Sequence, residues 1–275
     1  MNKHMIELIG AEKNIKGNRI LNGIHIRLDQ GERAAIIGHN GSGKSTLLKL
    51  MAGFIEPTAG SVKRRTKKIG FVPEHFPDQN RFRMKEFLLY AGRMGGRTKP
   101  ELEEEIEYYA ELFHAEGFLE TPLKNCSKGT MQKAGIIQAL LLQPDVLLLD
   151  EPLTGLDEEA QQAFLRYLPG LNGKMAIAFT AHESFLVREA ADRVITLENG
   201  SVISNVNNIA EAVKYIKVLV PDISILKELP AVQYSQLDHN LFIIKEAASA
   251  SDILLKSLLN SGCSIVEVIE RGGVF

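Results

Sequence analysis

A glycine-rich segment gives the strongest chemical signal in the chain. Residues 38–46 read Gly-His-Asn-Gly-Ser-Gly-Lys-Ser-Thr, which fits the pattern G-x-x-x-x-G-K-S/T. The apolar run 34–37 precedes it as a buried strand would, and the apolar-periodic run 47–51 follows it as a helix would. In that context the glycines let several backbone N–H groups converge on one anion, and the helix N-terminus adds partial positive charge. The segment predicts a phosphate site, and a chance glycine-rich turn is the weaker interpretation.

The side chains of this segment suit a triphosphate with Mg²⁺. Lys44 is placed to reach the β- and γ-phosphates, and Ser45 to offer its hydroxyl oxygen to the metal. The whole cradle is expected to comprise Gly38, His39, Asn40, Gly41, Ser42, Gly43, Lys44, Ser45 and Thr46.

Two acidic residues end a second buried run. Asp150 and Glu151 follow the apolar residues 146–149, and open α/β sheets bind ligands at the carboxyl ends of their strands. Asp150 is suited to hold Mg²⁺ directly or through water, and Glu151 could polarise an attacking water molecule. A solvated pair of acids is the alternative, which the phosphate loop upstream makes the weaker one.

Two further features lie at the ends of predicted elements. His182 follows the buried strand 176–179 and could hydrogen-bond a γ-phosphate while holding Glu151 in register, although a lone histidine is more often an ordinary residue. Residues 127–129, Ser-Lys-Gly, precede a helix and offer a second anion seat, which an ordinary N-cap explains equally well without context. If another subunit supplied that seat, the nucleotide would lie buried between two chains.

Composition limits the class of protein. The 275 residues suit a large α/β domain with an appendage, and a net charge of −2 does not call for nucleic acid as a partner. The two cysteines, Cys126 and Cys263, have neither framework nor metal spacing, so we expect a reducing compartment. Residues 1–10 have no long apolar core, so we expect no signal peptide, and the sequence lacks an apolar run of about 20 residues. We therefore expect a soluble protein whose membrane role, if any, comes through a partner.

Periodicity predicts the remaining elements. The region from 84 to 119 is helical, with breaks at 95–96 and 99–100, and is interpreted as a helical insertion. Past residue 205 we expect a small α+β appendage without a chemical motif. The strands expected outside the motifs lie at 5–9, 24–28, 69–73, 194–197, 201–203, 215–220, 241–244 and 265–269, and further helices lie at 158–168 and 251–259. The strands 194–197 and 201–203 are expected to form a hairpin that turns at Asn199-Gly200. The basic run at 63–68 is interpreted as a solvated strand and turn, and a nucleic-acid patch is the weaker alternative.

Taken in order, these motifs resemble the nucleotide-binding subunit of ATP-binding cassette (ABC) transporters over about residues 4–203. The phosphate loop, the Walker B strand 147–151, the D-loop ending at Asp157 and the switch histidine His182 match closely. The signature segment falls at 126–130, and a Q-loop-like position falls at Glu74.

The resemblance implies an α/β fold of the P-loop NTPase class. The ABC cassette would fill residues 1–204, with a RecA-like core, an antiparallel β subdomain and a helical subdomain at about 84–140. The small C-terminal α+β accessory domain would fill 205–275.

The resemblance also implies an ATPase subunit that powers a separate integral membrane permease, on the cytoplasmic face of the cell membrane. The cassette would pair with a second copy, as a homodimer, or with another cassette. ATP and Mg²⁺ would lie between the phosphate loop of one chain and Ser127, Lys128, Gly129 and Asp157 of the other. Glu151, His182 and Lys44 would form the catalytic set, and Ser45, Asp150 and Glu74 would hold the metal. The helical insertion and the loop around Glu74 would receive the permease.

Three departures from the family pattern alter these expectations. The usual Leu-Ser-Gly-Gly-Gln signature reads Cys-Ser-Lys-Gly-Thr here, and Glu74 replaces the Q-loop glutamine. The latter resembles cassettes of ABC-2-type transporters, many of them exporters, so we expect an exporter. The aromatic residue that normally stacks on adenine falls near Ile15 or Lys16, neither of which is aromatic. We therefore predict slack discrimination between ATP and GTP.

Two alternatives remain open at this point. A soluble cassette ATPase working on ribosomes or DNA usually has two cassettes, a coiled-coil insertion or zinc-binding cysteines, and this sequence has none of these. A regulatory module would close on ATP without turnover, and the presence of both Glu151 and His182 argues against it.

Overall fold

The chain divides into two compact units, residues 1–207 and 208–275. The computed structural model describes residues 4–76, 81–168, 175–207, 213–229, 233–247 and 250–271. The boundary expected after residue 204 falls inside the last strand of the first unit, Ser201–Asn207 (β9). None of the described helices has the length and apolar character that a bilayer span requires.

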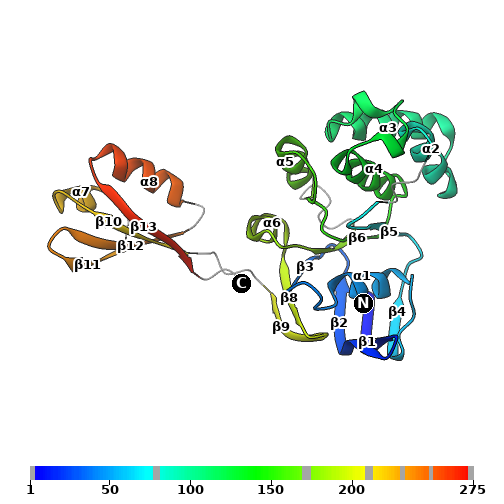
Figure 1. The fold of residues 1–275 in the computed structure, drawn as a ribbon, viewed down its shortest axis with the longest axis horizontal. Helices are drawn as coiled ribbons and strands as arrows, with labels where there is room; N and C mark the ends of the chain where they lie inside the picture. The colour runs from blue at the N-terminus through cyan, green and yellow to red at the C-terminus, as the bar shows by residue number, and fades with distance from the viewer. Residues whose placement is uncertain are drawn as a thin grey trace. The chain divides into compact units, whose positions relative to one another are not determined.

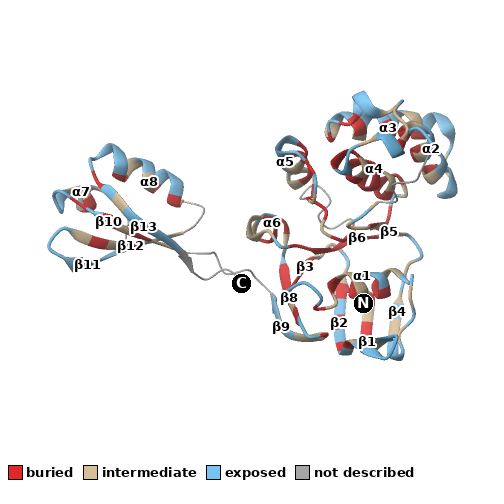
Figure 2. Cartoon of the chain, viewed as in Figure 1, coloured by how far each residue is buried: buried red, intermediate tan, exposed pale blue. Residues whose placement is uncertain are grey.

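A six-stranded sheet forms the centre of the first unit, in the order β5-β6-β7-β3-β8-β9 (Figure 1). Its other strands are β3 (Arg33–Ile37), β5 (Ile69–Val72), β6 (Val146–Leu149), β7 (Ala176–Thr180) and β8 (Arg193–Glu198). The first five strands in that order run parallel, and β9 closes the edge as the antiparallel half of the predicted hairpin. Every residue of β6 and β7 is buried, as expected for parallel strands covered on both faces (Figure 2). Because β6, β7 and β3 are neighbours, the three motifs at their carboxyl ends meet at one edge of the sheet.

Among the described residues, the core includes the helices α1 (Lys44–Ala52), α5 (Glu158–Tyr167) and α6 (Ser184–Ala190). The helix predicted after the phosphate loop is confirmed, and Gly53 ends it in a left-handed conformation at φ 83°. Helix α6 escaped prediction because seven residues are too few for a helical repeat to stand out.

A three-stranded antiparallel sheet, β2-β1-β4, packs on α1 and on one side of the central sheet. Its strands are β1 (His4–Ile15), β2 (Asn18–Asp29) and β4 (Ala59–Arg64), longer than the strands that the sequence predicted. Leu8 and Leu28 lie in the same buried cluster as Leu47 of α1 and Leu148 of β6. One residue of the basic run at 63–68 contributes to this packing. The Arg64 guanidinium donates to the Met51 carbonyl oxygen (2.9 Å) at the end of α1.

The predicted helical insertion consists of α2 (Met84–Met94), α3 (Lys99–Leu112) and α4 (Lys128–Leu141), with short 3₁₀ turns at Glu116–Phe118 and Leu123–Asn125. The expected break into two helices is confirmed and lies at residues 95–98, but Lys99 and Pro100 begin the second helix instead of belonging to the break. Pro100 lies in the first turn of α3, where its missing N–H is not needed, and Thr98 caps that helix with Glu101. Helix α4 is buried on most of its surface, so it is the centre of this layer.

The second unit has the element order β10 (Val213–Leu219), α7 (Ser224–Glu228), β11 (Gln233–Asp238), β12 (Leu241–Ala247), α8 (Ser251–Asn260) and β13 (Ser264–Arg271). This βαββαβ order, with sheet order β11-β12-β10-β13, is ferredoxin-like. The second unit has a separate hydrophobic core, which includes Ile216, Phe242 and Leu258. The predicted strands and helix are present. Strand β11 and helix α7 were missed, because the edge strand β11 is mostly polar and exposed and α7 has only five residues.

Candidate functional site

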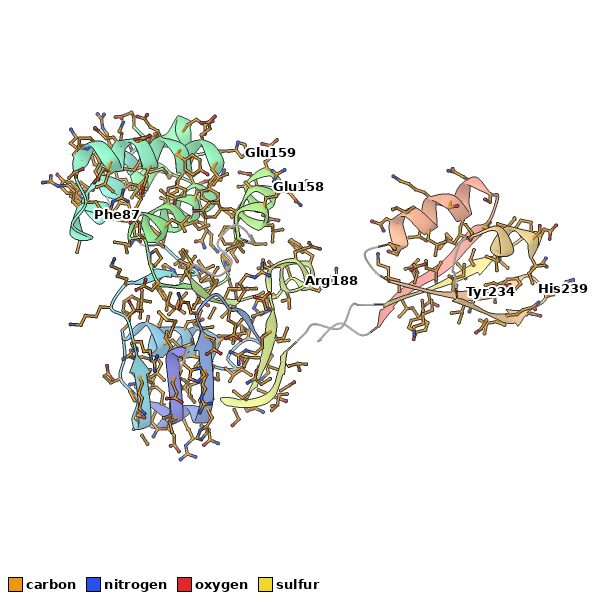
Figure 3. The ribbon with its side chains drawn as sticks, turned by 180° about the vertical axis from the view of Figure 1, so that it is seen from behind. Phe87, Glu158, Glu159, Arg188, Tyr234 and His239 are labelled. Carbon is orange, nitrogen blue, oxygen red and sulfur yellow. The ribbon has the colours of Figure 1, made fainter. Side chains whose placement is uncertain are left out.

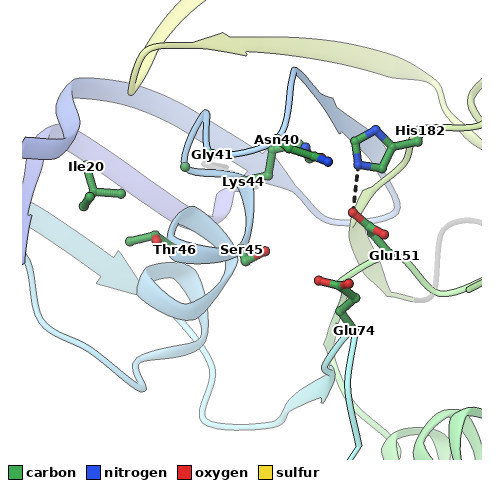
Figure 4. Close-up of a pocket in the computed structure, with 10 residues that line it drawn as sticks. Ile20, Asn40, Gly41, Lys44, Ser45, Thr46, Glu74, Glu151 and His182 are labelled. Atoms are coloured by element: carbon green, nitrogen blue, oxygen red, sulfur yellow. Dashed lines mark ion pairs between the residues drawn. The ribbon is translucent and has the colours of Figure 1, made fainter. Parts of the chain in front are cut away.

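A cavity of about 550 Å³ opens at the carboxyl ends of the central strands (Figure 4). Most of the predicted site residues contribute to its wall. The lining residues are Ile20, Asn40, Gly41, Gly43, Lys44, Ser45, Thr46, Glu74, Glu151 and His182. Of the predicted cradle, Gly38, His39 and Ser42 shape the loop from outside this lining.

Backbone geometry explains two of the loop glycines. At Gly38, with φ +153°, a Cβ atom would lie 2.1 Å from the Leu197 carbonyl oxygen of β8. At Gly43, with φ +105°, a Cβ atom would lie 3.0 Å from the Ile20 carbonyl oxygen. The loop therefore passes between β8 and β2 through gaps that only glycine fits.

The Lys44 side chain folds back over the loop. Its Nζ atom donates to the carbonyl oxygens of Gly38 (2.8 Å) and His39 (3.3 Å). Burial lowers the pKa of the Lys44 ammonium, and the carboxylates of Glu151, Asp150 and Glu74 oppose that shift. The loop thus holds a partly desolvated positive charge facing the cavity, which suits a phosphate oxygen.

The two acids after β6 are fixed by a threonine on the neighbouring strand. The Thr180 hydroxyl donates to Oδ1 of Asp150 (2.8 Å) and accepts a hydrogen bond from the Glu151 backbone N–H (2.8 Å). Asp150 is buried, whereas Glu151 adopts φ +48° and turns its side chain into the cavity. A left-handed backbone at a non-glycine residue costs about 1–2 kcal/mol, so the surrounding structure must hold it. The role of Thr180 was not predicted, although a polar residue that ends the apolar run 176–179 is visible in the sequence.

His182 and Glu151 meet directly. The His182 Nε2 atom lies 2.8 Å from Oε1 of Glu151, and the Thr154 hydroxyl donates to Oε2 of Glu151 at 3.4 Å. Glu151 is therefore oriented from both sides while its carboxylate remains in the cavity wall. The predicted pairing of this acid with His182 is present in the structure.

The residues proposed for Mg²⁺ are partly assembled. Ser45 and Glu74 line the cavity, and Asp150 lies behind Glu151 with its hydrogen bond to Thr180. Among the described residues, no group of three or more His, Cys, Asp and Glu side chains forms a ready metal site. Mg²⁺ needs no such group when phosphate oxygens and waters complete its octahedron, so the Ser45 hydroxyl and these carboxylates fit the ion.

The second group of predicted residues lies away from the cavity. The Ser127 hydroxyl caps α4 by accepting a hydrogen bond from the Thr130 N–H (3.1 Å), and Asp157 caps α5 in the same way from Ala160 (2.8 Å). Ser127, Lys128, Gly129 and Asp157 are absent from the cavity lining. Within one chain, therefore, Ser127 acts as an ordinary N-cap.

Strand β2 contributes an aliphatic side chain to the cavity wall. Ile20 lines the cavity (Figure 4), whereas Ile15 and Lys16, where the base contact was expected, are absent from its lining. Ile15 is 41% exposed, and Lys16 adopts φ +49° in the hairpin turn. Ile20 was missed because the expected base contact was placed at the start of the hairpin turn.

Comparison with known proteins gives the family. The family model described as ABC transporter matches residues 21–154. The zinc import ATP-binding protein ZnuC of Halorhodospira halophila is 33% identical over 203 residues, which is 72% of this chain and 75% of the relative. An ABC transporter ATP-binding protein of Methanocaldococcus jannaschii is 29% identical over 250 residues, covering 90% of this chain and 92% of the relative.

Solved structures agree on the fold. An ATP-binding subunit of an ABC transporter superposes with a TM-score of 0.68 at 26% identity, covering 74% of this chain and 90% of the other. A dimeric ATP-binding cassette in a post-hydrolysis state with ADP and Pi superposes with a TM-score of 0.66 at 24% identity, covering 74% and 98%. The predicted P-loop ABC cassette fold is therefore confirmed, and the chain belongs to the family of ABC transporter ATP-binding proteins.

Proposed function

We propose that this chain binds ATP with Mg²⁺, hydrolyses the nucleotide, and uses the cycle to drive a separate integral membrane permease. The observation that supports this best is the shared cavity, where the Lys44 ammonium and the joined side chains of Glu151 and His182 face one volume. Positive charge for the phosphates and a positioned base for water are the two requirements of phosphoryl transfer to water.

In the proposed reaction, Glu151 accepts the proton of the attacking water. His182 holds the Glu151 carboxylate on one side and Thr154 holds it on the other, so the base needs little reorganisation. The backbone N–H groups of the loop and Lys44 stabilise negative charge on the phosphoryl group. Bound Mg²⁺ supplies further charge neutralisation, with Ser45, Glu74 and Asp150 as the residues that would hold it.

A second copy of the chain is part of this proposal. Ser127, Lys128, Gly129 and Asp157 are exposed or intermediate except for Gly129, and they lie outside the cavity of their own chain. In a two-fold pairing they would close the partner's cavity with a helix N-terminus directed at the nucleotide. ATP would then favour the closed pair by its differential affinity for that state.

The surface for the permease is proposed to be an apolar groove on the helical subdomain. A cavity of about 430 Å³ is lined by Phe82, Phe87, Tyr90, Ala91, Met94 and Gln138. Tyr90 is 57% and Met94 89% exposed, which is unusual for large apolar side chains. Such a groove suits the apolar face of a short helix presented by a membrane protein at the cytoplasmic surface.

One ring contact connects this groove to the nucleotide cavity. The Phe76 ring meets the Phe87 ring edge to face, with centroids 5.4 Å apart. Phe76 is two positions from Glu74, which lines the nucleotide cavity. A change in the metal or phosphate contacts of Glu74 therefore has a short path to the groove, and this supports coupling between ATP and the permease.

We also propose the ABC-2-type class, hence an exporter. This rests on Glu74 at the Q-loop position. Relatives include proteins named for import of zinc and of spermidine and putrescine, so transport direction needs its own measurement. Inside-out vesicles containing the chain and its co-purified permease should accumulate cargo on adding ATP. Uptake by right-side-out vesicles with ATP trapped inside them would contradict export.

The test of hydrolysis is the Glu151→Gln variant. It should abolish steady-state ATP turnover, retain ATP and accumulate a dimer visible by light scattering, because glutamine keeps the shape but cannot accept the proton. Glu159→Gln on α5 is the matched control, since Glu159 lies on the exposed face of that helix (Figure 3). Unchanged turnover in Glu151→Gln would exclude Glu151 as the base.

A further inference from the structure

Helix α4 contains a buried lysine that the proposed reaction does not use. Lys133 is 4% exposed, and its Nζ atom donates to Oδ2 of Asp157 (2.7 Å) and to the His114 carbonyl oxygen (3.1 Å). One ammonium thus joins α4, the end of the α3 segment and the loop that leads into α5. Burying an ammonium is unfavourable unless hydrogen bonds and an opposite charge compensate, and the Asp157 carboxylate and the His114 carbonyl oxygen supply both.

Asp157 is held on both carboxylate oxygens. Oδ2 accepts from Lys133, while Oδ1 accepts from the Ala160 N–H at the start of α5. The hydrogen bond from Lys133 is the main cause that holds the pKa of Asp157 below its ordinary value, followed by the bond from Ala160. The Asp157 carboxylate is consequently held in place by both of its oxygens, although its side chain is 58% exposed.

The backbone of the same loop touches the tip of α4. A Cβ atom on Gly129 would lie 2.0 Å from the Gly155 carbonyl oxygen, so the two chain segments approach as closely as glycine allows. Further back, Tyr109 of α3 and Tyr167 of α5 place their hydroxyl oxygens 3.1 Å apart. The N-terminal half of α4 and the loop before α5 are therefore joined at two points, and the tyrosine contact adds a link between α3 and α5.

We propose that Lys133 is a positioning residue for the neighbouring subunit's ATP site. It fixes the Asp157 loop against the N-terminus of α4, so that Ser127 and Asp157 meet the nucleotide held by a second copy of the chain as one preformed surface. The inference rests on the proposed function, because it requires a two-fold dimer with ATP at the interface between the two copies. It assigns to Lys133 an effect on pairing and none on its own chain's cavity.

The experiment uses the Glu151→Gln chain, in which ATP should stabilise the dimer. Adding Lys133→Met should weaken ATP-dependent dimerisation by about tenfold or more, because the preformed surface loses its ion pair. ATP affinity of the monomer, measured with dilute protein, should stay the same. Lys133→Arg should restore dimerisation, since a guanidinium can reach both the carboxylate and the carbonyl oxygen.

Asp157→Asn provides a second variant in case Lys133→Met does not fold. Asparagine still caps α5, so folding should survive while the charged partner of Lys133 is lost. The two substitutions together should weaken dimerisation no more than the stronger single one, which would measure the coupling of the pair. Arg97→Met is the matched control, because it removes a two-bond ion pair with Glu105 elsewhere in the helical subdomain.

The outcomes separate this inference from the proposed function. If the Glu151→Gln chain itself forms no ATP-dependent dimer, the proposed function fails. If that dimer forms and Lys133→Met leaves its dissociation constant unchanged, the role of Lys133 is excluded. Additive effects of Lys133→Met and Asp157→Asn, or an equal loss of monomer ATP affinity, would also overturn it.

Discussion

Thr180 shows how one small hydroxyl can organise two acids. It donates to Asp150 and accepts from the Glu151 N–H, both at 2.8 Å, and it is fully buried. Thr180→Val keeps the shape but leaves both partners unsatisfied, which costs about 1–3 kcal/mol of stability. We expect turnover to fall by about tenfold because Glu151 loses its backbone anchor. Steady-state kinetics and thermal unfolding measure the two effects.

Thr180→Ser is the control for that change. Serine retains the hydroxyl at the end of β7, so turnover should stay near that of the parent chain. A Thr180→Val chain as active as the parent would show that the left-handed backbone of Glu151 is maintained without the threonine.

Ile20 lines the cavity and is the residue that we expect to contact the base. Its aliphatic side chain offers contact to any purine but neither stacking nor hydrogen bonds. The parent chain should therefore bind ATP and GTP with similar affinity. Ile20→Ala should weaken both by about threefold to tenfold, as the loss of part of a buried isoleucine implies. Equilibrium binding with fluorescent ATP and GTP analogues measures this.

Ile15→Ala is the comparison, since Ile15 lies outside the cavity lining. It should change neither affinity. A strong preference of the parent chain for ATP over GTP would contradict the prediction of weak discrimination between the bases. A larger loss of affinity in Ile15→Ala than in Ile20→Ala would indicate that the base contacts the hairpin turn and not Ile20.

Residues within motifs could be predicted from sequence, and residues that act across strands could not. Lys44, Glu151 and His182 stand at fixed places relative to an apolar run, and the structure places all three in the cavity wall. Thr180, Lys133 and Ile20 each act on a partner that is distant in sequence, so their roles depend on strand order and helix packing. That information is not local to any stretch of the chain.

At the scale of elements, helix α2 presents the groove proposed for the permease. Tyr90→Glu places a charge on its apolar wall, where desolvation on docking would be unfavourable. Co-purification with the permease should fall strongly, while ATP turnover of the isolated subunit should not change. Affinity purification from solubilised membranes, followed by an ATPase assay, measures both.

Tyr108→Glu on α3 is a closely matched control. Tyr108 is 56% exposed, against 57% for Tyr90, and it does not line the groove. Retained co-purification is expected for that variant. Equal loss in both variants would indicate a general effect of added charge and would remove the groove as the docking surface.

Helices and strands could be predicted where they are long enough for the pattern of apolar residues to repeat. The buried strands β6 and β7 and the long helices α3 and α4 are continuous signals, and each lies where the sequence indicated. The short helices α6 and α7 have five to seven residues, too few for the pattern. Pro100 was predicted to lie in a break, but it lies in the first turn of α3, because proline is common at helix starts as well as in breaks.

At the scale of the whole molecule, the sequence indicated two parts because chemical motifs stop near residue 200 while strand and helix patterns continue. The structure gives each part its own core, in which Leu28 and Leu148 pack in the first unit and Ile216 and Phe242 in the second. The ferredoxin-like order of the second unit could not be predicted, because it depends on the two elements with the weakest patterns, β11 and α7.

Separate cores predict separate unfolding. Phe242 is 2% exposed in the second unit, and Phe242→Ala should destabilise that unit by about 3–5 kcal/mol through lost burial and a cavity. Calorimetry of the full chain should show one transition shifted down, with the other unmoved and ATP turnover retained. Phe164→Ala, at a residue 1% exposed in α5 of the first unit, should shift the other transition instead and reduce turnover. If each substitution shifts a single common transition, the two units unfold as one cooperative body and the second unit stabilises the ATPase directly.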